Sequence, residues 1–469
     1  MADKATFPGG FLWGAATAAY QIEGAVRDGG RGVSIWDTFS HAPGHVVNGD
    51  TGDVTCRHYE RVDEDLDLMG DLSLGAYRFS VAWPRVQPDG KGPANQQGLD
   101  FYKGLVSGLR QRGMVPVATL YHWDLPQPLE DEGGWTVRET AERYAEYVGI
   151  VAAALGDEVG MWITLNEPWC SAWLGYGVGM HAPGLTNPQL SMRATHHLLL
   201  GHALATDVIR RDSKAPVGIT LNLAPQIPAS DHPLDVAAAR RSDGGLNRMY
   251  LDPLFKASYP EDVVSAAEAV GLRMDVVRDA DMALIGRPVD FLGVNYYMSH
   301  VVASTARLAE ARQAGYVAPD SLLSEPTALL GMAQVGRPWL ERTAMDWEID
   351  PAGLTSLLVR LRDEYTNAPI YVTESGVAFY DYQAPDGSVH DPARIAYLHA
   401  HIKALKDAID AGVDVRGYFV WSLMDNFEWA EGYSKRFGLA WVDYPTGKRV
   451  RKDSFEWYKR LIAANALPS

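Results

Sequence analysis

Eight short apolar segments, separated by stretches with helical periodicity, constrain the fold more than any other feature of this chain of 469 residues. The segments are almost continuously hydrophobic, as is typical of strands that are buried on both faces of a parallel sheet. They cover residues 12–19, 76–82, 115–121, 161–165, 217–221, 289–295, 370–373 and 415–421. Eight strands that alternate with helices predict an α/β fold, a (β/α)8 TIM barrel, and the pattern leaves an open doubly wound sheet as the alternative.

Three of the intervening helices have distinct signals. Apolar residues recur at helical spacing over 99–109. The sequence Thr-Val-Arg-Glu at 136–139 has the pattern of a capping box and predicts a helix that continues to Leu155. A further helix is expected from Pro392 to about Gly412.

The chain is longer than a barrel alone requires. A typical (β/α)8 barrel has about 250 residues, so the surplus must lie in extended βα loops or additional elements. The segments 222–250 and 299–346 are the clearest insertions. Because no low-complexity tract, block of like charges or flexible linker interrupts the sequence, we expect residues 1–469 to form a single domain.

Charge and composition restrict the partners. Lys and Arg number 42 and Asp and Glu number 59, which gives a net charge of −17. A surface of this sign repels nucleic acid and anionic membranes. The sequence contains no apolar run of membrane-spanning length and no secretory signal, so a cytoplasmic protein is expected. A homo-oligomer is compatible with the sequence.

Cysteine and histidine usage indicates no metal or cofactor site. The two cysteines, Cys56 and Cys170, lie far apart and form no CxxC pair. A metal-dependent barrel hydrolase would be expected to carry clustered ligands such as His-x-His after the first strand, and that segment has no histidine.

Polar and aromatic residues follow seven of the eight predicted strands. The carboxyl ends of barrel strands open on one face, so these residues are expected to converge there. Each of them alone is an ordinary strand-end residue, but together they predict a shared site. They are Gln21, Arg78, His122, Asn166, Glu167, Asn295, Tyr297, Glu374, Trp421, Glu428 and Trp429.

This set has the chemistry of a sugar site. Indole faces stack on the apolar faces of sugar rings, and amides, imidazoles and carboxylates bond hydroxyls. Glycoside hydrolysis requires two carboxyl groups, about 5–5.5 Å apart for retention of configuration and about 6.5–9.5 Å apart for inversion. Glu167 and Glu374, at the ends of the fourth and seventh strands, are the candidates. Because a guanidinium lowers the pKa of a neighbouring carboxyl, we expect Arg78 and Tyr297 to hold Glu374 as the ionised nucleophile.

The motifs resemble those of the β-glucosidases of glycoside hydrolase family 1, in the family's order and over nearly the whole chain. The matching segments are Phe-Leu-Trp-Gly-Ala-Ala-Thr-Ala-Ala-Tyr-Gln-Ile-Glu-Gly at 11–24, Tyr-Arg-Phe-Ser at 77–80, Tyr-His-Trp-Asp-Leu-Pro at 121–126, Thr-Leu-Asn-Glu-Pro at 164–168, Asn-Tyr-Tyr at 295–297, Val-Thr-Glu-Ser-Gly at 372–376, and 421–429. The resemblance implies a barrel enzyme that hydrolyses terminal β-D-glucosyl residues of cello-oligosaccharides and aryl or alkyl β-glucosides, with retention and without a cofactor.

The resemblance also implies a role for each matching residue. Glu167 would be the general acid/base and Glu374 the nucleophile, supported by Arg78 and Asn295. The remaining roles are sugar binding by Gln21, His122, Asn166, Glu428 and Trp429, stacking under the sugar by Trp421, a bond to the nucleophile from Tyr297, a contact with the leaving group from Trp347, and the lining of the entrance by Trp169 and Leu174.

Two residues depart from the family pattern. Ser375 replaces the Asn of a Glu-Asn-Gly motif, and Asp346 replaces a small residue before Trp347. Two further positions separate subgroups. Glu428 disfavours 6-phospho sugars, because a carboxylate repels phosphate. Glu167 stands where plant thioglucosidases carry Gln, which favours O-glycosides as substrates.

Other functions use overlapping residues. A non-catalytic sugar-binding protein would keep the aromatic ring but lose a catalytic carboxylate, and both carboxylates are present. A transglycosylase would use the same residues as a hydrolase. The choice among glucose, fucose and galactose stays open, because Gln21 and Glu428 can bond the hydroxyls of each.

Overall fold

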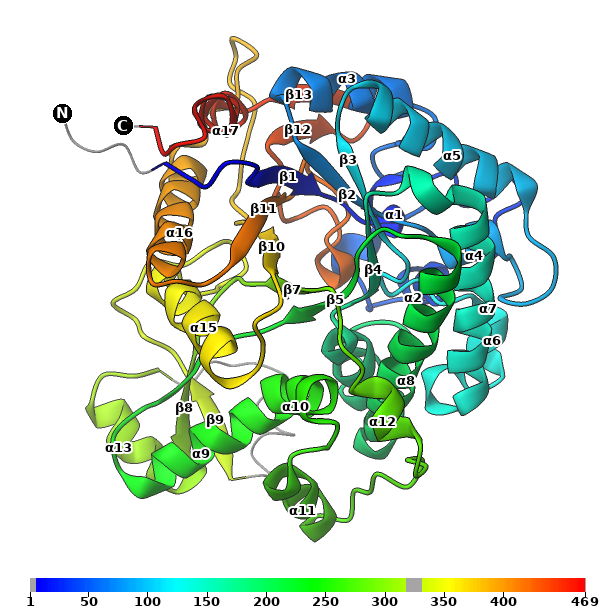
Figure 1. Ribbon diagram of the computed structural model, residues 1–469. Coiled ribbons are helices and arrows are strands. Elements are labelled where there is room, and N and C mark those ends of the chain that lie inside the picture. Colours follow the sequence, from blue (N-terminus) through cyan, green and yellow to red (C-terminus); the bar gives the residue numbers. More distant parts are fainter. Residues whose placement is uncertain (1–5, 318–330, 469) are drawn as a thin grey trace.

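A closed barrel of eight parallel strands forms the centre of the computed structural model, which describes residues 6–317 and 331–468 (Figure 1). The strands are β1 (Leu12–Ala16), β2 (Ala76–Ser80), β3 (Val115–Thr119), β4 (Met161–Asn166), β5 (Val217–Asn222), β7 (Phe291–Asn295), β10 (Ile370–Ser375) and β11 (Val415–Trp421). Each is hydrogen-bonded to the next barrel strand in the chain, and β11 pairs with β1 to close the barrel. The predicted (β/α)8 barrel is confirmed, and the open doubly wound sheet is excluded.

The barrel strands coincide with the eight predicted apolar segments. The clearest difference is at the first of them, where β1 ends at Ala16 and a short helix, α1 (Ala19–Ile22), follows. The register between β1 and β11 places Ala16 beside Trp421, so the ends of the first and last strands meet at the carboxyl face.

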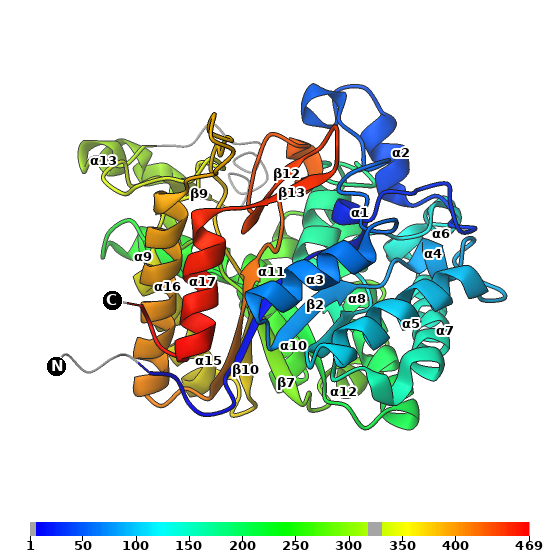
Figure 2. The ribbon, with the colours of Figure 1, turned by 90° about the horizontal axis from the view of Figure 1, so that it is seen from above.

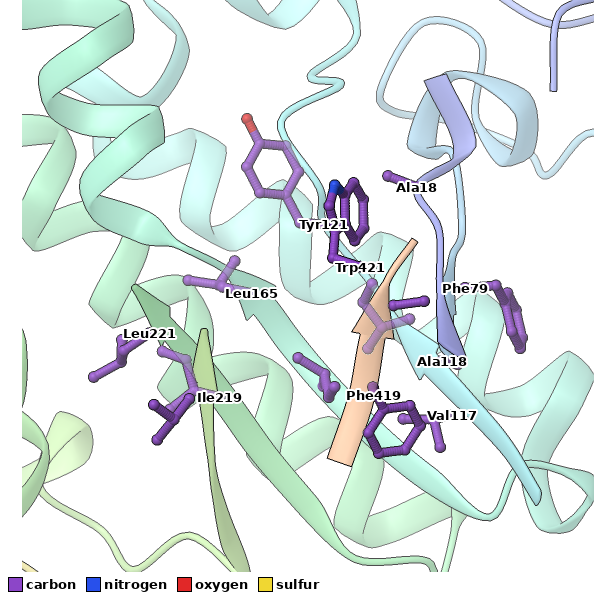
Figure 3. Close-up of a cluster of buried hydrophobic side chains, with 14 of the residues drawn as sticks. Ala18, Phe79, Val117, Ala118, Tyr121, Leu165, Ile219, Leu221, Phe419 and Trp421 are labelled. Atoms are coloured by element: carbon purple, nitrogen blue, oxygen red, sulfur yellow. The ribbon is translucent and has the colours of Figure 1, made fainter. Parts of the chain in front are cut away.

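The strands are apolar throughout because both of their faces are buried. Figure 3 shows side chains of β3, β5 and β11, including Val117, Ile219 and Phe419, in one buried cluster. Gly14 of β1 provides room for the Phe419 ring, since a Cβ at this position would lie 2.3 Å from the nearest ring carbon.

One helix after each strand covers the outside of the barrel (Figures 1 and 2). In chain order these are α3 (Val62–Leu72), α5 (Gln96–Gln111), α7 (Arg138–Leu155), α8 (Pro188–Asp212), α12 (Asp281–Ile285), α15 (Pro351–Glu364), α16 (Pro392–Asp410) and α17 (Asp453–Ala464). The remaining α-helices are α2 (Ile35–His41), α4 (Trp83–Val86), α6 (Gln127–Asp131), α9 (Pro233–Asp243), α10 (Met249–Lys256), α11 (Glu261–Ala269) and α13 (Leu308–Gln313).

All three predicted helices are confirmed, as α5, α7 and α16, but the capping box predicted at the start of α7 is wrong. Helix α7 begins at Arg138, and its N-cap is Val137, whose side chain makes no capping hydrogen bond. Thr136 instead closes a 3-10 turn and donates its hydroxyl to the Gly133 carbonyl at 2.6 Å. The hydroxyl that a capping box requires is therefore used by the preceding turn.

Both predicted insertions contain additional elements. Strands β6 (Gln226–Pro228), β8 (His300–Ser304) and β9 (Met332–Val335) form a separate sheet, which packs against α9 (Figure 1). Part of the second insertion, 318–330, lies outside the described residues. A hairpin of β12 (Ala440–Asp443) and β13 (Lys448–Arg451) follows β11. Among the described helices, none has the length and apolar character needed to cross a membrane.

Candidate active site

The two candidate catalytic glutamates lie at the carboxyl face of the barrel. Glu374 is the next-to-last residue of strand β10, and Glu167 directly follows the last residue of β4. The Glu167 backbone has a φ of 49° and is held there by a hydrogen bond from its N–H to the Thr220 carbonyl of β5, at 2.9 Å. Left-handed backbone at a residue other than Gly costs roughly 1–3 kcal/mol and persists where the surrounding structure fixes it.

Two donors hold the Glu374 carboxylate. Arg78 Nη1 lies 2.5 Å from Oε1, and the Tyr297 hydroxyl donates to Oε2 at 2.7 Å. Arg78 comes from β2, is almost completely buried, and is itself fixed by bonds to Thr119 Oγ1 and the Thr373 carbonyl, both at 3.1 Å. A guanidinium and a phenol that both donate to one carboxyl group favour its ionised form.

Glu167 lies in a different environment. Asn295 Nδ2 donates to its Oε1 at 2.6 Å, and the Cys170 thiol donates to its Oε2 at 3.1 Å. Burial raises the pKa of Glu167 to about 7, the negative charge of Glu374 adds to the increase, and the two hydrogen bonds oppose it. Burial also raises the pKa of Glu374, but there the Arg78 charge and the Tyr297 hydroxyl act against it. The carboxyl that lacks a direct cation is thus the better proton donor.

Asparagines connect the two glutamates. Arg78 Nη2 donates to Asn166 Oδ1 at 2.6 Å, and Thr373 Oγ1 donates to Asn295 Oδ1 at 2.8 Å. Asn295, which the family resemblance assigns to support of the nucleophile, hydrogen-bonds both glutamates. It donates to Glu167 Oε1 at 2.6 Å, and its bond to Glu374 acts against the effect of burial on the pKa of that carboxyl. Asn166 Nδ2 faces His122 Nε2 at 3.0 Å, so the amide and the imidazole are fixed together.

His122 lies between two indoles. Its ring is nearly parallel to the ring of Trp421, at 5.8 Å between centroids, and to that of Trp429, at 5.9 Å. Burial, and secondly the charge of Arg78, lowers the pKa of His122 well below its ordinary value. A neutral imidazole has one donor and one acceptor nitrogen, which suits a hydroxyl ligand.

Gln21 and Glu428 form the opposite part of the polar ring. Gln21 is fully buried, and its Nε2 donates to the Phe427 carbonyl at 2.8 Å and to Asn426 Oδ1 at 3.0 Å. The same nitrogen lies 3.5 Å from Glu428 Oε2. Burial raises the pKa of Glu428 to about 8, and the charge of Glu374 adds to the increase. Glu428 and Gln21 thus present adjacent polar groups at the carboxyl face of the barrel.

The position of Trp421 depends on Gly376, which directly follows the β10 strand. A Cβ on Gly376 would lie 1.7 Å from the Trp421 carbonyl oxygen, so only glycine allows the two segments to approach this closely. Ser375, the departure from the family motif, is fully buried, and the hydroxyl of Tyr418 points to its carbonyl at 3.5 Å. Ser375 is thus packed in the protein interior, beside Tyr418.

The outer aromatic wall is formed by Trp347. Its ring packs at 5.2 Å from Tyr297 and at 6.2 Å from Phe437, and the side chain is partly exposed. Asp346 has a φ of 60°, and its carboxylate, 78% exposed, pairs with Arg342 at 3.3 Å. The Asp346 charge, at a position where the resemblance implies a small residue, thus lies in solvent beside Trp347.

The two predicted entrance residues differ in exposure. Trp169 is partly exposed, whereas Leu174 is buried in the main hydrophobic core. Two residues that contact the site are not among those predicted from the sequence. Cys170 donates to Glu167, and Asn426 accepts a hydrogen bond from Gln21. The signal for Cys170 was its position three residues after Glu167, since that spacing allows a turn to bring the two side chains together.

No cluster of three or more His, Cys, Asp or Glu side chains with metal-binding geometry occurs in residues 6–317 and 331–468.

The family model of glycosyl hydrolase family 1 matches residues 3–467. The chain belongs to glycosyl hydrolase family 1. The resemblance drawn from the sequence motifs is therefore confirmed.

Members of the family with similar sequences carry glucosidase names. The chain is 49% identical to a bifunctional β-D-glucosidase/β-D-fucosidase of Bifidobacterium breve, over 97% of this chain and 98% of that protein. It is 45% identical to β-glucosidase A of Thermotoga maritima, over 98% of each.

Solved structures of the family superimpose over the full chain. The family 1 β-glucosidase of Thermotoga maritima matches with a TM-score of 0.91 and 44% identity, and each chain is covered completely. The same enzyme in complex with deoxynojirimycin matches with a TM-score of 0.91 and 45% identity, over 99% of this chain and 100% of that one.

Proposed function

We propose that this protein is a retaining β-glucosidase that releases terminal non-reducing β-D-glucosyl residues from cello-oligosaccharides and from aryl and alkyl β-glucosides. The observation that carries the proposal is the asymmetry of the two carboxyl groups. Arg78 and Tyr297 donate to Glu374, and burial raises the pKa of Glu167 to about 7. We further propose that residues 1–469 act as a single catalytic domain.

In the first step, Glu374 attacks the anomeric carbon and Glu167 gives its proton to the departing glycosidic oxygen. The products are the released alcohol and a glucosyl ester of Glu374. Asn166 is placed to bond the 2-hydroxyl, where hydrogen bonds strengthen as the oxocarbenium character develops. The Trp421 indole stacks under the sugar, and Trp347 contacts the leaving group.

In the second step, Glu167 acts as a base. It removes a proton from water, the water oxygen attacks the anomeric carbon, and the ester bond to Glu374 breaks. The two inversions leave the product in the β configuration. A sugar hydroxyl that replaces water gives transglycosylation, so the balance of the two reactions depends on which acceptor reaches the glucosyl ester.

Glucose is the proposed principal sugar, and fucose is the second. Fucose lacks the hydroxyl of the exocyclic carbon, and a relative with 49% identity is named for activity on both sugars. Galactose, a third candidate, differs from glucose only at the 4-hydroxyl. Gln21 and Glu428 are adjacent, and together they can bond the hydroxyls of each of these sugars.

The charge of the site favours sugars without phosphate. A 6-phosphate would enter a buried space that already holds Glu167, Glu374 and Glu428. The nearby guanidinium of Arg78 is engaged by Glu374. Like charges in a buried site repel strongly because water does not screen them.

We also propose that the enzyme is cytoplasmic. Its cysteines, Cys56 and Cys170, are both free and buried, which is compatible with a reducing compartment. Light scattering of the purified protein would measure whether it forms a homo-oligomer.

The test is chemical rescue of a Glu374→Gly variant with an aryl β-glucoside as substrate. The variant should be inactive alone, and azide should restore turnover with an α-glucosyl azide as product, because azide occupies the space of the lost carboxylate. A variant that retains full activity without azide would refute the proposed nucleophile. A β-glucosyl azide would refute retention through Glu374.

A further inference from the structure

A single residue after β4 holds both the backbone and the carboxyl group of Glu167. The Cys170 N–H donates to the Glu167 carbonyl at 2.9 Å and closes a turn with Pro168 inside it. The Cys170 thiol lies 3.1 Å from Glu167 Oε2. The turn thus brings the thiol back over the side chain of the residue that starts it.

The thiol is the donor in this contact. Burial raises the pKa of Cys170 well above its ordinary value, and the charge of Glu167 raises it further, so the sulfur keeps its proton. Asn295 donates to the other carboxyl oxygen, Oε1. Each oxygen of Glu167 therefore has one donor, and Cys170 supplies one of the two.

The other ionisable groups act differently on Glu167. The carboxyl group is influenced by the charges of Glu374 on β10, Arg78 on β2 and Glu428 after β11, and it faces the phenol of Tyr297 after β7. The Glu374 charge favours the protonated form of Glu167, and the Arg78 charge favours the ionised form. A hydrogen bond from a neutral thiol also stabilises a carboxylate more than a carboxylic acid.

We propose that Cys170 is a positioning residue that supports the base form of Glu167 in the second chemical step. In the free enzyme burial, together with the charge of Glu374, keeps a proton on Glu167. In the glucosyl ester that charge is absent, and the thiol bond helps the carboxylate to accept a proton from water. This inference rests on the proposed β-glucosidase function.

The experiment uses Cys170→Ala and Cys170→Ser with an aryl β-glucoside that has a good leaving group, so that hydrolysis of the ester limits kcat. Loss of the thiol raises the pKa of Glu167. The basic limb of kcat/KM reports protonated Glu167, and the acidic limb of kcat reports ionised Glu167. Both limbs should move to higher pH by about half a unit. On the acidic limb, at pH well below the pKa of Glu167 in the ester, the Ala variant should lose about threefold in kcat, with KM lowered as the ester accumulates.

Two matched variants separate this effect from a structural one. Cys170→Ser keeps a donor and should restore both limbs. Cys56→Ala removes the other buried thiol, which donates to the Asp425 carbonyl at 3.1 Å, and should leave the pH profiles unchanged. Concentrations of active enzyme are taken from the burst of released phenol, so a misfolded fraction does not alter the rate constants.

The outcomes distinguish this inference from the proposed function. Unchanged pH limbs in Cys170→Ala, or equal shifts in Cys56→Ala, would overturn the role of Cys170. A wild-type protein that hydrolyses no β-glucoside would refute the proposed function instead. If the Ala variant yields no folded protein, Cys170→Val supplies a second variant without a donor, and the same shifts are required of it.

Discussion

At the scale of single residues, the electrostatics of the site depends on Arg78. Its three guanidinium nitrogens contact side chains of β3, β4 and β10, and Nη1 also bonds the Thr373 carbonyl. Burial raises the pKa of Glu374, and the positive charge of Arg78 acts against this rise. Without Arg78, Glu374 would be a buried carboxyl that keeps only neutral donors, among them the Tyr297 hydroxyl and the Asn295 amide.

Replacement of Arg78 should therefore raise the pKa of Glu374. Because the nucleophile must be ionised, the acidic limb of kcat/KM should move to higher pH in Arg78→Lys and Arg78→Ala. We expect a loss of kcat/KM of about 100-fold or more, since removal of one strong electrostatic contact typically costs 100- to 1,000-fold. The measurement is a pH profile with an aryl β-glucoside. Full activity with an unchanged acidic limb would contradict this account.

Gly376, two residues after Glu374, allows the close approach of the Trp421 backbone. In Gly376→Ala the added Cβ must displace the Trp421 carbonyl, which it would otherwise approach to 1.7 Å. We expect a loss of about 1–3 kcal/mol in stability and a rise in KM. Thermal unfolding and steady-state kinetics would measure both.

The matched control is Gly104→Ala in α5, where an added Cβ meets no atom within 4 Å. Alanine at this helical position should stabilise the protein or leave it unchanged. If the two alanine variants behave alike, the close approach of Gly376 and Trp421 is not what limits substitution.

At the scale of elements, the sequence predicted the barrel strands well, because continuous apolar runs are rare outside doubly buried strands. It failed at the start of α7, where Thr136 uses its hydroxyl in a local turn and not in a cap. It also did not predict the sheet of β6, β8 and β9, whose pairing joins residues that lie far apart in sequence, 74 positions for Gln226 with His300 and 34 for Val301 with Val335.

In the site, too, contacts between residues that are distant in sequence could not be predicted. Residue types and strand ends identified Glu167, Glu374 and Arg78, since each follows or lies in an apolar run. The bond between Asn295 and Glu167 depends on the spacing of β7 and β4 around the barrel, and a linear sequence does not contain it. The contact of Cys170 depends on the turn after β4.

An ion cluster joins three of the outer helices. Asp281 of α12 receives two bonds from Arg138 of α7, at 2.8 and 2.9 Å, and one contact from His196 of α8, at 2.9 Å. Burial acts to raise the pKa of Asp281, but the bonds from Arg138 and His196 outweigh it, and the pKa is lowered below its ordinary value.

Asp281→Asn should therefore destabilise the protein by about 1.5–3 kcal/mol at pH 7, since it removes a buried carboxylate to which Arg138 and His196 both bond. Because the folded pKa of Asp281 is depressed, its stabilisation is present above the unfolded value, about 3.9, and is lost as pH falls toward the folded value. The difference in the free energy of unfolding between variant and wild type, measured by urea unfolding, should thus become smaller below about pH 4.

The exposed pair of Arg193 and Asp275 is the control for this cluster. Its side chains are 37% and 39% exposed. Asp275→Asn should cost less than about 1 kcal/mol, because water already screens the pair. Equal losses in Asp275→Asn and Asp281→Asn would contradict the importance assigned to burial.

At the scale of the whole molecule, barrel closure brings together residues that are far apart in the chain. Strand β1 pairs with β11, and the Phe7 N–H donates to the Asn465 carbonyl at 3.0 Å, so the first and last described segments lie side by side (Figures 1 and 2). Gln21, from the start of the chain, is bonded to Phe427, from near its end. The sugar site therefore requires the complete barrel.

The central claim is that Glu374 forms a covalent ester with the sugar while Glu167 transfers the proton. It is tested most directly with a 2-deoxy-2-fluoro-β-glucoside that carries a good leaving group, because fluorine slows hydrolysis of the ester. The account predicts one sugar per chain, loss of activity in step with labelling, and a labelled peptide that contains Glu374. The absence of a covalent adduct, or a label on Glu167, would contradict it.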